Sequence, residues 1–136
     1  MSDRISIEDY RLLQEGKGKR PKAQKPKTDY KQIFLQQIEF AKLPMPELEV
    51  KFHASRKWRL DFAWEKEMIA IEYHGIFGVH KAGHQAVKSL QRDYEKANEA
   101  ILLGWLYLTI TAETVDSGQA LTWLEKALTQ RNKGKL

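Results

Sequence analysis

Two acidic residues lie inside segments that otherwise have the pattern of buried β-strands. Asp61 falls in KWRLDFAW (residues 57–64), in which large apolar residues alternate with other residues, and Glu72 falls in EMIAIEYHG (residues 67–75). Alternation with a period of two is typical of a β-strand. Because a buried carboxylate is costly without a compensating partner, these two positions constrain the fold and the function more than any others.

We expect the two segments to form a hairpin that brings the acids together. A two-residue turn at Glu65 and Lys66 would place Asp61 diagonal to Glu72, whereas a four-residue turn would place them directly opposite. In both cases the carboxylates project from one face, with their Cβ atoms roughly 5 to 7 Å apart, and His74 leaves on the same side. Two carboxylates this close repel each other, so one takes up a proton unless a cation compensates them.

The residues leave two ways of compensating the acids open. One is a divalent cation such as Mg²⁺ or Mn²⁺, because these hard ions accept one or two carboxylates together with water and phosphate oxygens. The other is an ion pair of Asp61 with Arg59 or Lys51 across the sheet, with Glu72 facing solvent, since antiparallel sheets commonly have one wet face.

The whole pattern predicts an α/β fold in the order αβββαβα. A helix between the third and fourth strands implies a crossover and therefore a mixed four-stranded sheet. The fourth strand is largely apolar, so we expect it to be central. The expected elements are a first helix in residues 28–43, three strands (47–54, 57–64 and 67–75), a long helix (84–104) that ends at Gly104, a fourth strand (105–111) and a last helix (116–136). Either Asp29 or Thr28 can cap the first helix.

The long helix is expected to have an apolar side and a basic side. The apolar residues recur at helical spacing and are predicted to face the core: Val87, Leu90, Tyr94, Ala97 and Ile101. Basic residues recur at three- or four-residue steps on another side and suit contacts with phosphates: Lys81, His84, Lys88 and Arg92. A charged helix face is also commonly only solvated, so both interpretations stay open.

The charge and length favour one basic domain with an N-terminal extension. The chain has 136 residues and a formal net charge of +5, which favours a polyanionic partner such as nucleic acid. Residues 1–28 are predicted to be a short helix followed by a basic flexible arm, and residues 29–136 the folded domain. The arm offers contacts to phosphates, with a solvated tether as the alternative: Lys17, Lys19, Arg20 and Lys22.

The sequence also predicts a compartment. It has no cysteine, no apolar run long enough for a membrane span and no apolar signal-peptide core. We therefore expect a cytoplasmic protein without a membrane partner.

Several motifs together resemble those of a known superfamily of nucleases. The pattern Asp61…Glu72-Tyr73-His74 on a hairpin is followed by a His-Gly turn, by His80, by an Arg-Asp pair in the long helix and by Gly-Trp before the next strand. This arrangement resembles the PD-(D/E)xK nucleases, and in particular the small very-short-patch-repair-type endonucleases of phage and bacteria. The resemblance covers about residues 30 to 130.

The resemblance implies a restriction-endonuclease-like fold and a metal site. Asp61 and Glu72 would bind Mg²⁺ or Mn²⁺, with the backbone carbonyl of Tyr73 and the carboxylate of Glu39 as further ligands. His80 would contact the scissile phosphate or a metal-bound water. The position that usually holds a lysine carries His74, which could orient or deprotonate the attacking water.

The implied function is metal-dependent hydrolysis of DNA in a bacterial or phage-infected cell, by nicking or by structure-specific cleavage. Because His74 replaces the usual lysine, a catalytically inactive DNA-binding module of the same fold is the alternative. A subunit of a larger nuclease or recombination complex, a homodimer and an enzyme that cleaves RNA also remain open.

Overall fold

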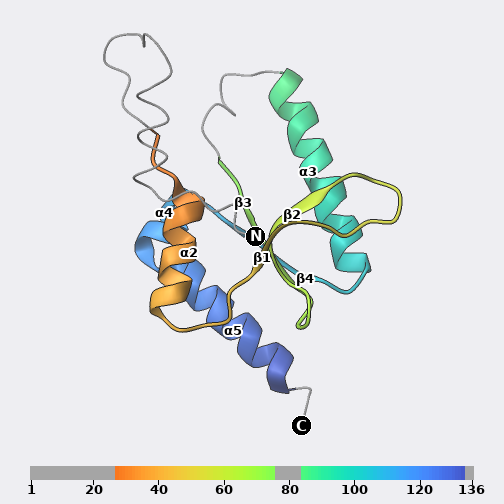
Figure 1. Ribbon diagram of the computed structural model, residues 1–136. Helices are drawn as coiled ribbons and strands as arrows, with labels where there is room; N and C mark the ends of the chain where they lie inside the picture. Colours follow the sequence, from red (N-terminus) through yellow and green to blue (C-terminus); the bar gives the residue numbers. More distant parts are fainter. Residues whose placement is uncertain (1–26, 76–83, 134–136) are drawn as a thin grey trace, which may run out of the picture.

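The computed structural model describes residues 27–75 and 84–133 (Figure 1). The order of helices and strands confirms the predicted α/β architecture. His80, Lys81 and the basic residues of the predicted arm (Lys17, Lys19, Arg20 and Lys22) lie outside the described residues. The elements are α2 (Tyr30–Phe40), β1 (Glu47–Lys51), β2 (Arg59–Trp64), β3 (Ile69–Tyr73), α3 (His84–Leu102), β4 (Leu106–Ile110), α4 (Ala112–Ser117) and α5 (Gln119–Lys133).

The four strands form one mixed sheet in the order β1-β2-β3-β4. β1 and β3 pair antiparallel with β2, and β4 pairs parallel with β3. The prediction that the fourth strand is central was wrong, because β4 is at an edge of the sheet. Its apolar residues contact cores on both faces, with Ile110 in one and Tyr107 against the other. Coverage by helices on both faces therefore explains the apolar composition.

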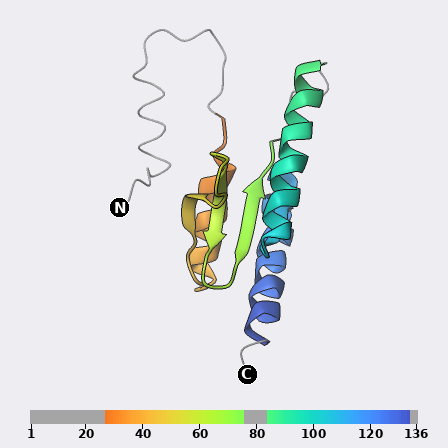
Figure 2. The same cartoon turned by 90° about the vertical axis from the view of Figure 1, so that its right-hand side faces the viewer.

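The sheet lies between two unequal layers of helices, with α2, α4 and α5 on one face and α3 on the other (Figures 1 and 2). The larger core joins Phe34 and Ile38 of α2 to Phe62 of β2 and Leu124 of α5. The smaller core lies under α3 and is built largely from alanines. In residues 27–75 and 84–133, no helix is long and apolar enough to cross a membrane.

The helices on the first face have clear start and stop signals. Asp29, one of the two caps that the sequence allowed, caps α2 by accepting the backbone N–H of Gln32. The predicted last helix is instead two helices, because Gly118, with φ of 84°, ends α4 and allows a change of direction before α5. Thr111 starts α4 with a capping box.

α3 packs on the sheet through small residues rather than through its large apolar residues. Ala100 is fully buried in the smaller core against Ala63 and Ala70. Of the five residues that were predicted to face the core, Leu90 and Ala97 are partly buried, whereas Val87, Tyr94 and Ile101 are exposed. Alanines on both surfaces leave no room for large side chains between the helix and the sheet, so the side of α3 centred on Ala97 and Ala100 faces inward.

Gly104 ends the long helix, as predicted, and its φ is 101°. The nearest atom to an added Cβ would be the Cε of Met68 at 3.7 Å, so an alanine has room there and only the backbone conformation is strained. We expect Gly104→Ala to lower the free energy of unfolding by about 1–2 kcal/mol, measured by urea denaturation. Ser89→Ala, on the exposed side of α3, is the matched control and should not destabilise; equal stability of the two variants would contradict the assignment.

Candidate active site

The β2–β3 hairpin places the two acids directly opposite each other. β2 ends at Trp64 and β3 begins at Ile69, so the turn has four residues. Phe62 pairs with Ile71, and the next position of the same register joins Asp61 to Glu72. Of the two turns that the sequence left open, the structure has the longer one.

At this position the carboxylates take over the role of the backbone ladder. The N–H of Asp61 donates to Glu72 Oε2 at 2.6 Å, and the N–H of Tyr73 donates to Asp61 Oδ2 at 2.9 Å. Each acid therefore holds the neighbouring strand with one of its oxygens. On the other side of β2, Glu49 of β1 has φ of 54° at the position opposite Asp61, so the regular pleat of the sheet is interrupted here.

The interruption changes the face on which Leu60 is buried. The alternation in the sequence predicted that Leu60 shares a face with Phe62 and Trp64. In the structure Leu60 packs in the smaller core under α3, whereas Phe62 and Trp64 pack in the larger core. A period-two pattern predicts faces only along a regular strand, and β2 is not regular at Asp61.

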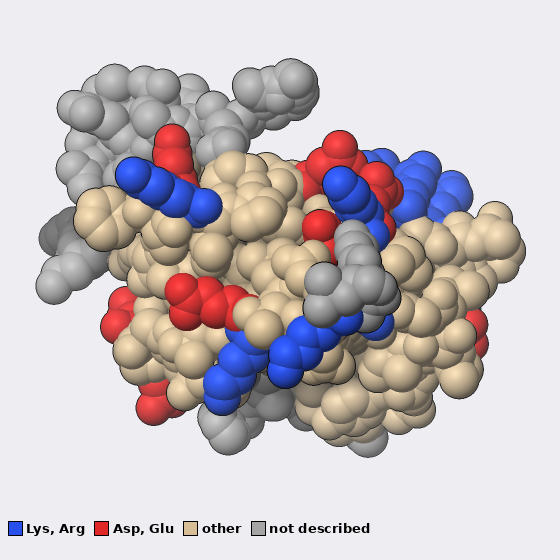
Figure 3. Space-filling model, turned by 90° about the horizontal axis from the view of Figure 1, so that it is seen from below, with Lys and Arg blue, Asp and Glu red and all other residues tan. Residues whose placement is uncertain are grey.

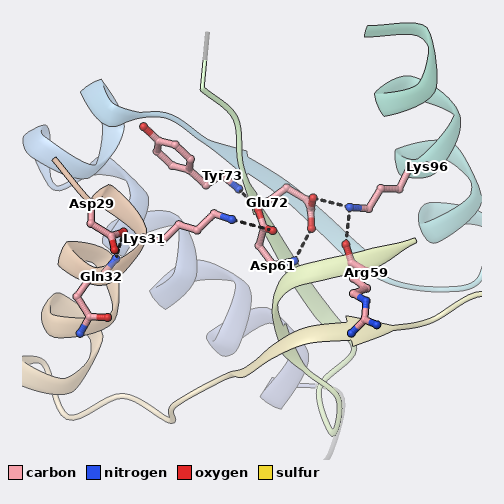
Figure 4. A network of polar contacts seen from close by, with 8 residues as sticks. All are labelled: Asp29, Lys31, Gln32, Arg59, Asp61, Glu72, Tyr73 and Lys96. Atoms are coloured by element: carbon pink, nitrogen blue, oxygen red, sulfur yellow. Dashed lines mark hydrogen bonds and ion pairs between the residues drawn. The ribbon is translucent and has the colours of Figure 1, made fainter. Parts of the chain in front are cut away.

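Two lysines compensate the acids, one from each layer of helices (Figure 4). The acids thus meet cations from opposite faces of the sheet, which corrects the prediction that both carboxylates project from one face; β2 is irregular at Asp61, so the regular alternation of faces does not hold there. Lys31 Nζ of α2 lies 3.2 Å from Asp61 Oδ1, and Lys96 Nζ of α3 lies 2.7 Å from Glu72 Oε1. Lys96 also donates to the carbonyl of Arg59. The side chains of Asp61, Glu72 and Lys96 are about equally buried, with 15%, 14% and 15% of their surface exposed, whereas Lys31 is 43% exposed.

These lysines correct the ion pair that the sequence suggested for Asp61, whereas the divalent cation stays a prediction. Asp61 is paired with neither Arg59 nor Lys51, and Glu72 does not face solvent. Each acid has one lysine as its partner in the structure. The four groups, Asp61, Glu72, Lys31 and Lys96, are called the acid–lysine cluster below.

The environment of Glu72 makes its charged form less favourable than in water. Burial raises the pKa of the Glu72 carboxyl, and the charge of Asp61 raises it further. The hydrogen bonds from Lys96 and from the Asp61 N–H, together with the charge of Lys96, act in the opposite direction. Burial likewise raises the pKa of the Tyr107 hydroxyl well above its ordinary value, with smaller contributions from the charges of Glu72 and Asp61. The cluster therefore lies in a partly desolvated environment.

A cavity of about 310 Å³ opens beside Glu72, between α3 and the sheet. His74 and Asp93 line it from opposite elements, with His74 Nδ1 3.7 Å from Asp93 Oδ2. Tyr107 and Thr109 of β4 complete its polar lining. The predicted site residue His74 thus lines the same cavity as Glu72.

The other predicted site residues are placed unevenly. Glu39 is exposed on α2 eight residues after Lys31, which is about 12 Å along the helix axis, so the structure does not bring it to the acids. Lys88 and Arg92 are exposed on α3. His84 begins α3, and the orientation of its side chain is outside the described residues.

One oxygen of each acid accepts a backbone N–H, so only the oxygens that pair with the lysines, Asp61 Oδ1 and Glu72 Oε1, remain for a metal. In the described part of the chain, no group of three or more His, Cys, Asp or Glu side chains is arranged to hold a metal. Mg²⁺ commonly takes one or two carboxylates and keeps several waters, so Asp61 Oδ1 and Glu72 Oε1 fit such an ion on condition that a lysine withdraws. Lys31 is the more exposed of the two and the easier to displace.

Charge alone does not locate a nucleic-acid surface. Seen from below, a band of lysine and arginine side chains crosses one face of the molecule, with acidic side chains around it (Figure 3). Charges of both signs are therefore interspersed on this face, and residues close to the acids are more informative than the net charge of +5.

The sequence reasoning missed both lysines of the cluster. Lys96 lies four residues after Arg92 and thus continues the predicted basic side of the long helix by one turn, so this signal was present. Lys31 is thirty residues from Asp61, and no local pattern marks it.

Comparisons with known proteins give a partial match. Over 75 residues, 54% of this chain, it is 32% identical to the uncharacterized protein MT2308 of Mycobacterium tuberculosis strain CDC 1551 / Oshkosh, and the same values hold for the uncharacterized protein Rv2248 of strain H37Rv. The matched part is 26% of each of those proteins, so the chain spans about a quarter of their length. No family model matches the chain, and no solved structure gives a significant match.

We expect Lys96→Met to raise the pKa of Glu72 further, because the lysine that lowers it is removed while the burial that raises it remains. A carboxyl titration by ¹³C NMR measures this directly. Lys88→Met, about two turns earlier on α3, is the control and should leave the titration of Glu72 as in the wild type. An unchanged pKa in Lys96→Met would show that the ion pair does not form in solution.

The same shift has a consequence for stability. A carboxyl whose pKa is raised in the folded state stabilises the fold at pH below its ordinary pKa and loses that contribution as the pH rises through the folded-state pKa. In Lys96→Met the loss should be larger and should extend to higher pH, as measured by denaturation between pH 4 and 8.

Proposed function

We propose that this protein is a metal-dependent DNA endonuclease whose active site is built on Asp61, Glu72 and Lys96. The observation that carries the proposal is the geometry of the hairpin, which presents two carboxylates at one position with a partly buried lysine 2.7 Å from the second. This geometry brings the two acids of the nuclease pattern next to the ammonium group of Lys96. In the nuclease pattern the lysine usually stands two residues after the second acid, where this chain has His74.

Each residue has a distinct part in the proposed site. Asp61 and Glu72 keep one oxygen for the backbone N–H across the hairpin, which fixes the direction of the other oxygen. A bound Mg²⁺ or Mn²⁺ would activate water and stabilise charge on the phosphate oxygens. Lys96, held between Glu72 and the Arg59 carbonyl, offers a fixed ammonium group to the attacking water or to the developing charge. Lys96 therefore takes the role expected of His74.

The site suits cleavage of one strand at a time. The cluster contains a single pair of carboxylates, so nicking is the expected product of one copy of the chain. The net charge of +5 and the exposed Lys88 and Arg92 on α3 support a polyanionic substrate. Cutting both strands would need a second copy or a partner subunit.

One observation favours the alternative of an inactive DNA-binding module. Both acids are already paired with lysines, which is how a purely structural cluster of charges is stabilised. The two functions differ in whether a divalent ion can displace Lys31.

Cleavage of supercoiled plasmid in Mg²⁺ or Mn²⁺ tests the proposed reaction. We expect Asp61→Asn, Glu72→Gln and Lys96→Met each to reduce nicking by about 10²–10³-fold. The amide variants keep an oxygen that can accept the backbone N–H, so the fold should persist. Lys126→Met, exposed on α5, is the charge-matched control and should nick as the wild type does. Absence of nicking by the wild type in either metal, with DNA binding intact, would favour the inactive module.

Binding of Mn²⁺ to the free protein separates the two functions without any substrate. Because Lys31 competes for Asp61, we expect Lys31→Ala to bind Mn²⁺ roughly two- to fivefold more tightly than the wild type, the range expected for loss of a partly exposed ion pair. Electron paramagnetic resonance or calorimetry gives the affinity. Asp61→Asn should abolish this binding, and tight binding in that variant would place the ion elsewhere.

A further inference from the structure

The segment that joins β1 to β2 is a concentrated source of positive charge beside the acid–lysine cluster. Residues 51–59, KFHASRKWR, run from the last residue of β1 to the first residue of β2 and contain no acid; they are called the basic loop here. All four of the basic side chains are exposed: Lys51, Arg56, Lys57 and Arg59. The prediction from sequence placed nucleic-acid contacts on the long helix and the N-terminal arm, and not here.

Two of these charges face each other without an acid between them. Lys51 pairs with Arg59 in the register of β1 and β2, and like charges directly opposite on a sheet are destabilising. Among residues 27–75 and 84–133, no ion pair involves Lys51, Lys57 or Arg59. The fold thus carries an unfavourable charge pair that an external anion would relieve.

The basic loop is held in one conformation by contacts within it. The ring of Phe52 stacks on Trp58 with centroids 6.1 Å apart, and the guanidinium of Arg56 lies 4.0 Å above the Trp58 ring. His53 Nδ1 accepts the backbone N–H groups of Ser55 and Arg56 at 3.2 and 3.0 Å. These contacts close a compact turn around Trp58.

The loop is also tied to α3. Because His53 Nδ1 accepts hydrogen bonds, its Nε2 is the nitrogen that donates to Glu99 Oε1, at 3.3 Å. Arg56 pairs with Glu95 at 3.2 Å. A ligand therefore meets a loop whose backbone is already ordered, which lowers the entropy cost of binding.

The backbone of the loop leads directly into the site. Arg59 is two residues before Asp61 on β2, and its carbonyl accepts a hydrogen bond from Lys96 (Figure 4). Two residues of strand span about 7 Å. The Arg59 guanidinium points away from the acids in Figure 4, so a polyanion bound to Lys51 and Arg59 would flank the cluster rather than enter it.

We infer that the basic loop binds the phosphate backbone of the DNA beside the scissile position, through Lys51, Lys57 and Arg59. This inference rests on the proposed function for the identity of the substrate. The contacts are to phosphates and position the nucleic acid without reading its bases. Arg56 is not among these contacts, because its guanidinium packs on Trp58 and pairs with Glu95, and it thereby holds the loop against α3.

Binding of a fluorescent 30-base-pair duplex to the full chain, in EDTA and over a series of KCl concentrations, tests the inference. We expect Lys51→Ala, Lys57→Ala and Arg59→Ala each to lower the slope of log K against log salt by about 0.9, with a similar loss for every DNA sequence tested. The double variant Lys51→Ala/Arg59→Ala should lose about twice as much. Lys126→Ala removes one exposed charge from α5 and should keep the wild-type slope.

A readout of stability distinguishes binding from a structural role. Because Lys51 and Arg59 repel each other, Lys51→Ala should leave the melting temperature unchanged or raise it while weakening DNA binding. A lowered melting temperature with an unchanged salt slope would overturn the inference, and so would failure of the wild type to bind DNA at 50 mM salt.

The inference and the proposed function fail in different ways. Metal-dependent nicking that is lost in Asp61→Asn, combined with wild-type salt slopes in all three loop variants, refutes the basic loop as the DNA contact and leaves the nuclease. Reduced slopes in the loop variants, with no nicking by the wild type in Mg²⁺ or Mn²⁺, refute the nuclease and leave the loop as the binding surface.

Discussion

The crossed hydrogen bonds between Asp61 and the third strand are the constraint on which the site depends. The N–H of Asp61 reaches Glu72, and the N–H of Tyr73 reaches Asp61, so both side chains replace backbone acceptors at the end of the hairpin. A variant that removes either carboxylate without an oxygen in its place leaves a partly buried N–H without its partner, which is destabilising. The two acids are therefore part of the fold as well as candidates for chemistry, and their loss is interpretable only with isosteric amides.

The acids lie where the regular pleat of the sheet is interrupted, and there each helix layer supplies one lysine to them. At this position the pleat of β2 is disturbed on both sides, by Glu49 with its positive φ and by the side-chain hydrogen bonds. Asp61 meets a lysine of α2, while Glu72 meets a lysine of α3. The Arg59 carbonyl then connects the second lysine to the basic loop. One local irregularity thus brings together the hairpin, both layers and the loop.

The sequence predicted what depends on local periodicity and missed what depends on long-range pairing. The hairpin, the αβββαβα order, the cap at Asp29 and the end of the long helix at Gly104 all follow from patterns a few residues long. The lysines do not, because Lys31 and Lys96 meet acids that are thirty and twenty-four residues away. The edge position of β4 depends on the side of the sheet order to which the crossover returns the chain. The exposure of Val87, Tyr94 and Ile101 depends on the alanines beneath α3. Neither feature can be read from one segment of the sequence.

Pairing of both acids with lysines is compatible with a nuclease, because the net charge of the cluster changes when a metal ion replaces one lysine. Two carboxylates and two ammonium groups sum to zero, so the cluster is neutral in the structure described here. If Lys31 gives up Asp61 to a divalent ion and swings into solvent, the two acids, Lys96 and that ion carry a net charge of +1. A phosphodiester carries one negative charge, so it would neutralise this arrangement, whereas it would gain little from the neutral one. Metal and substrate would then each favour the binding of the other, and the exposed Lys31 would be free to pair with a neighbouring phosphate. Because Lys31 is partly exposed, a metal ion can replace it at Asp61. If both lysines were as buried as Lys96, the same four charges would serve only to stabilise the fold.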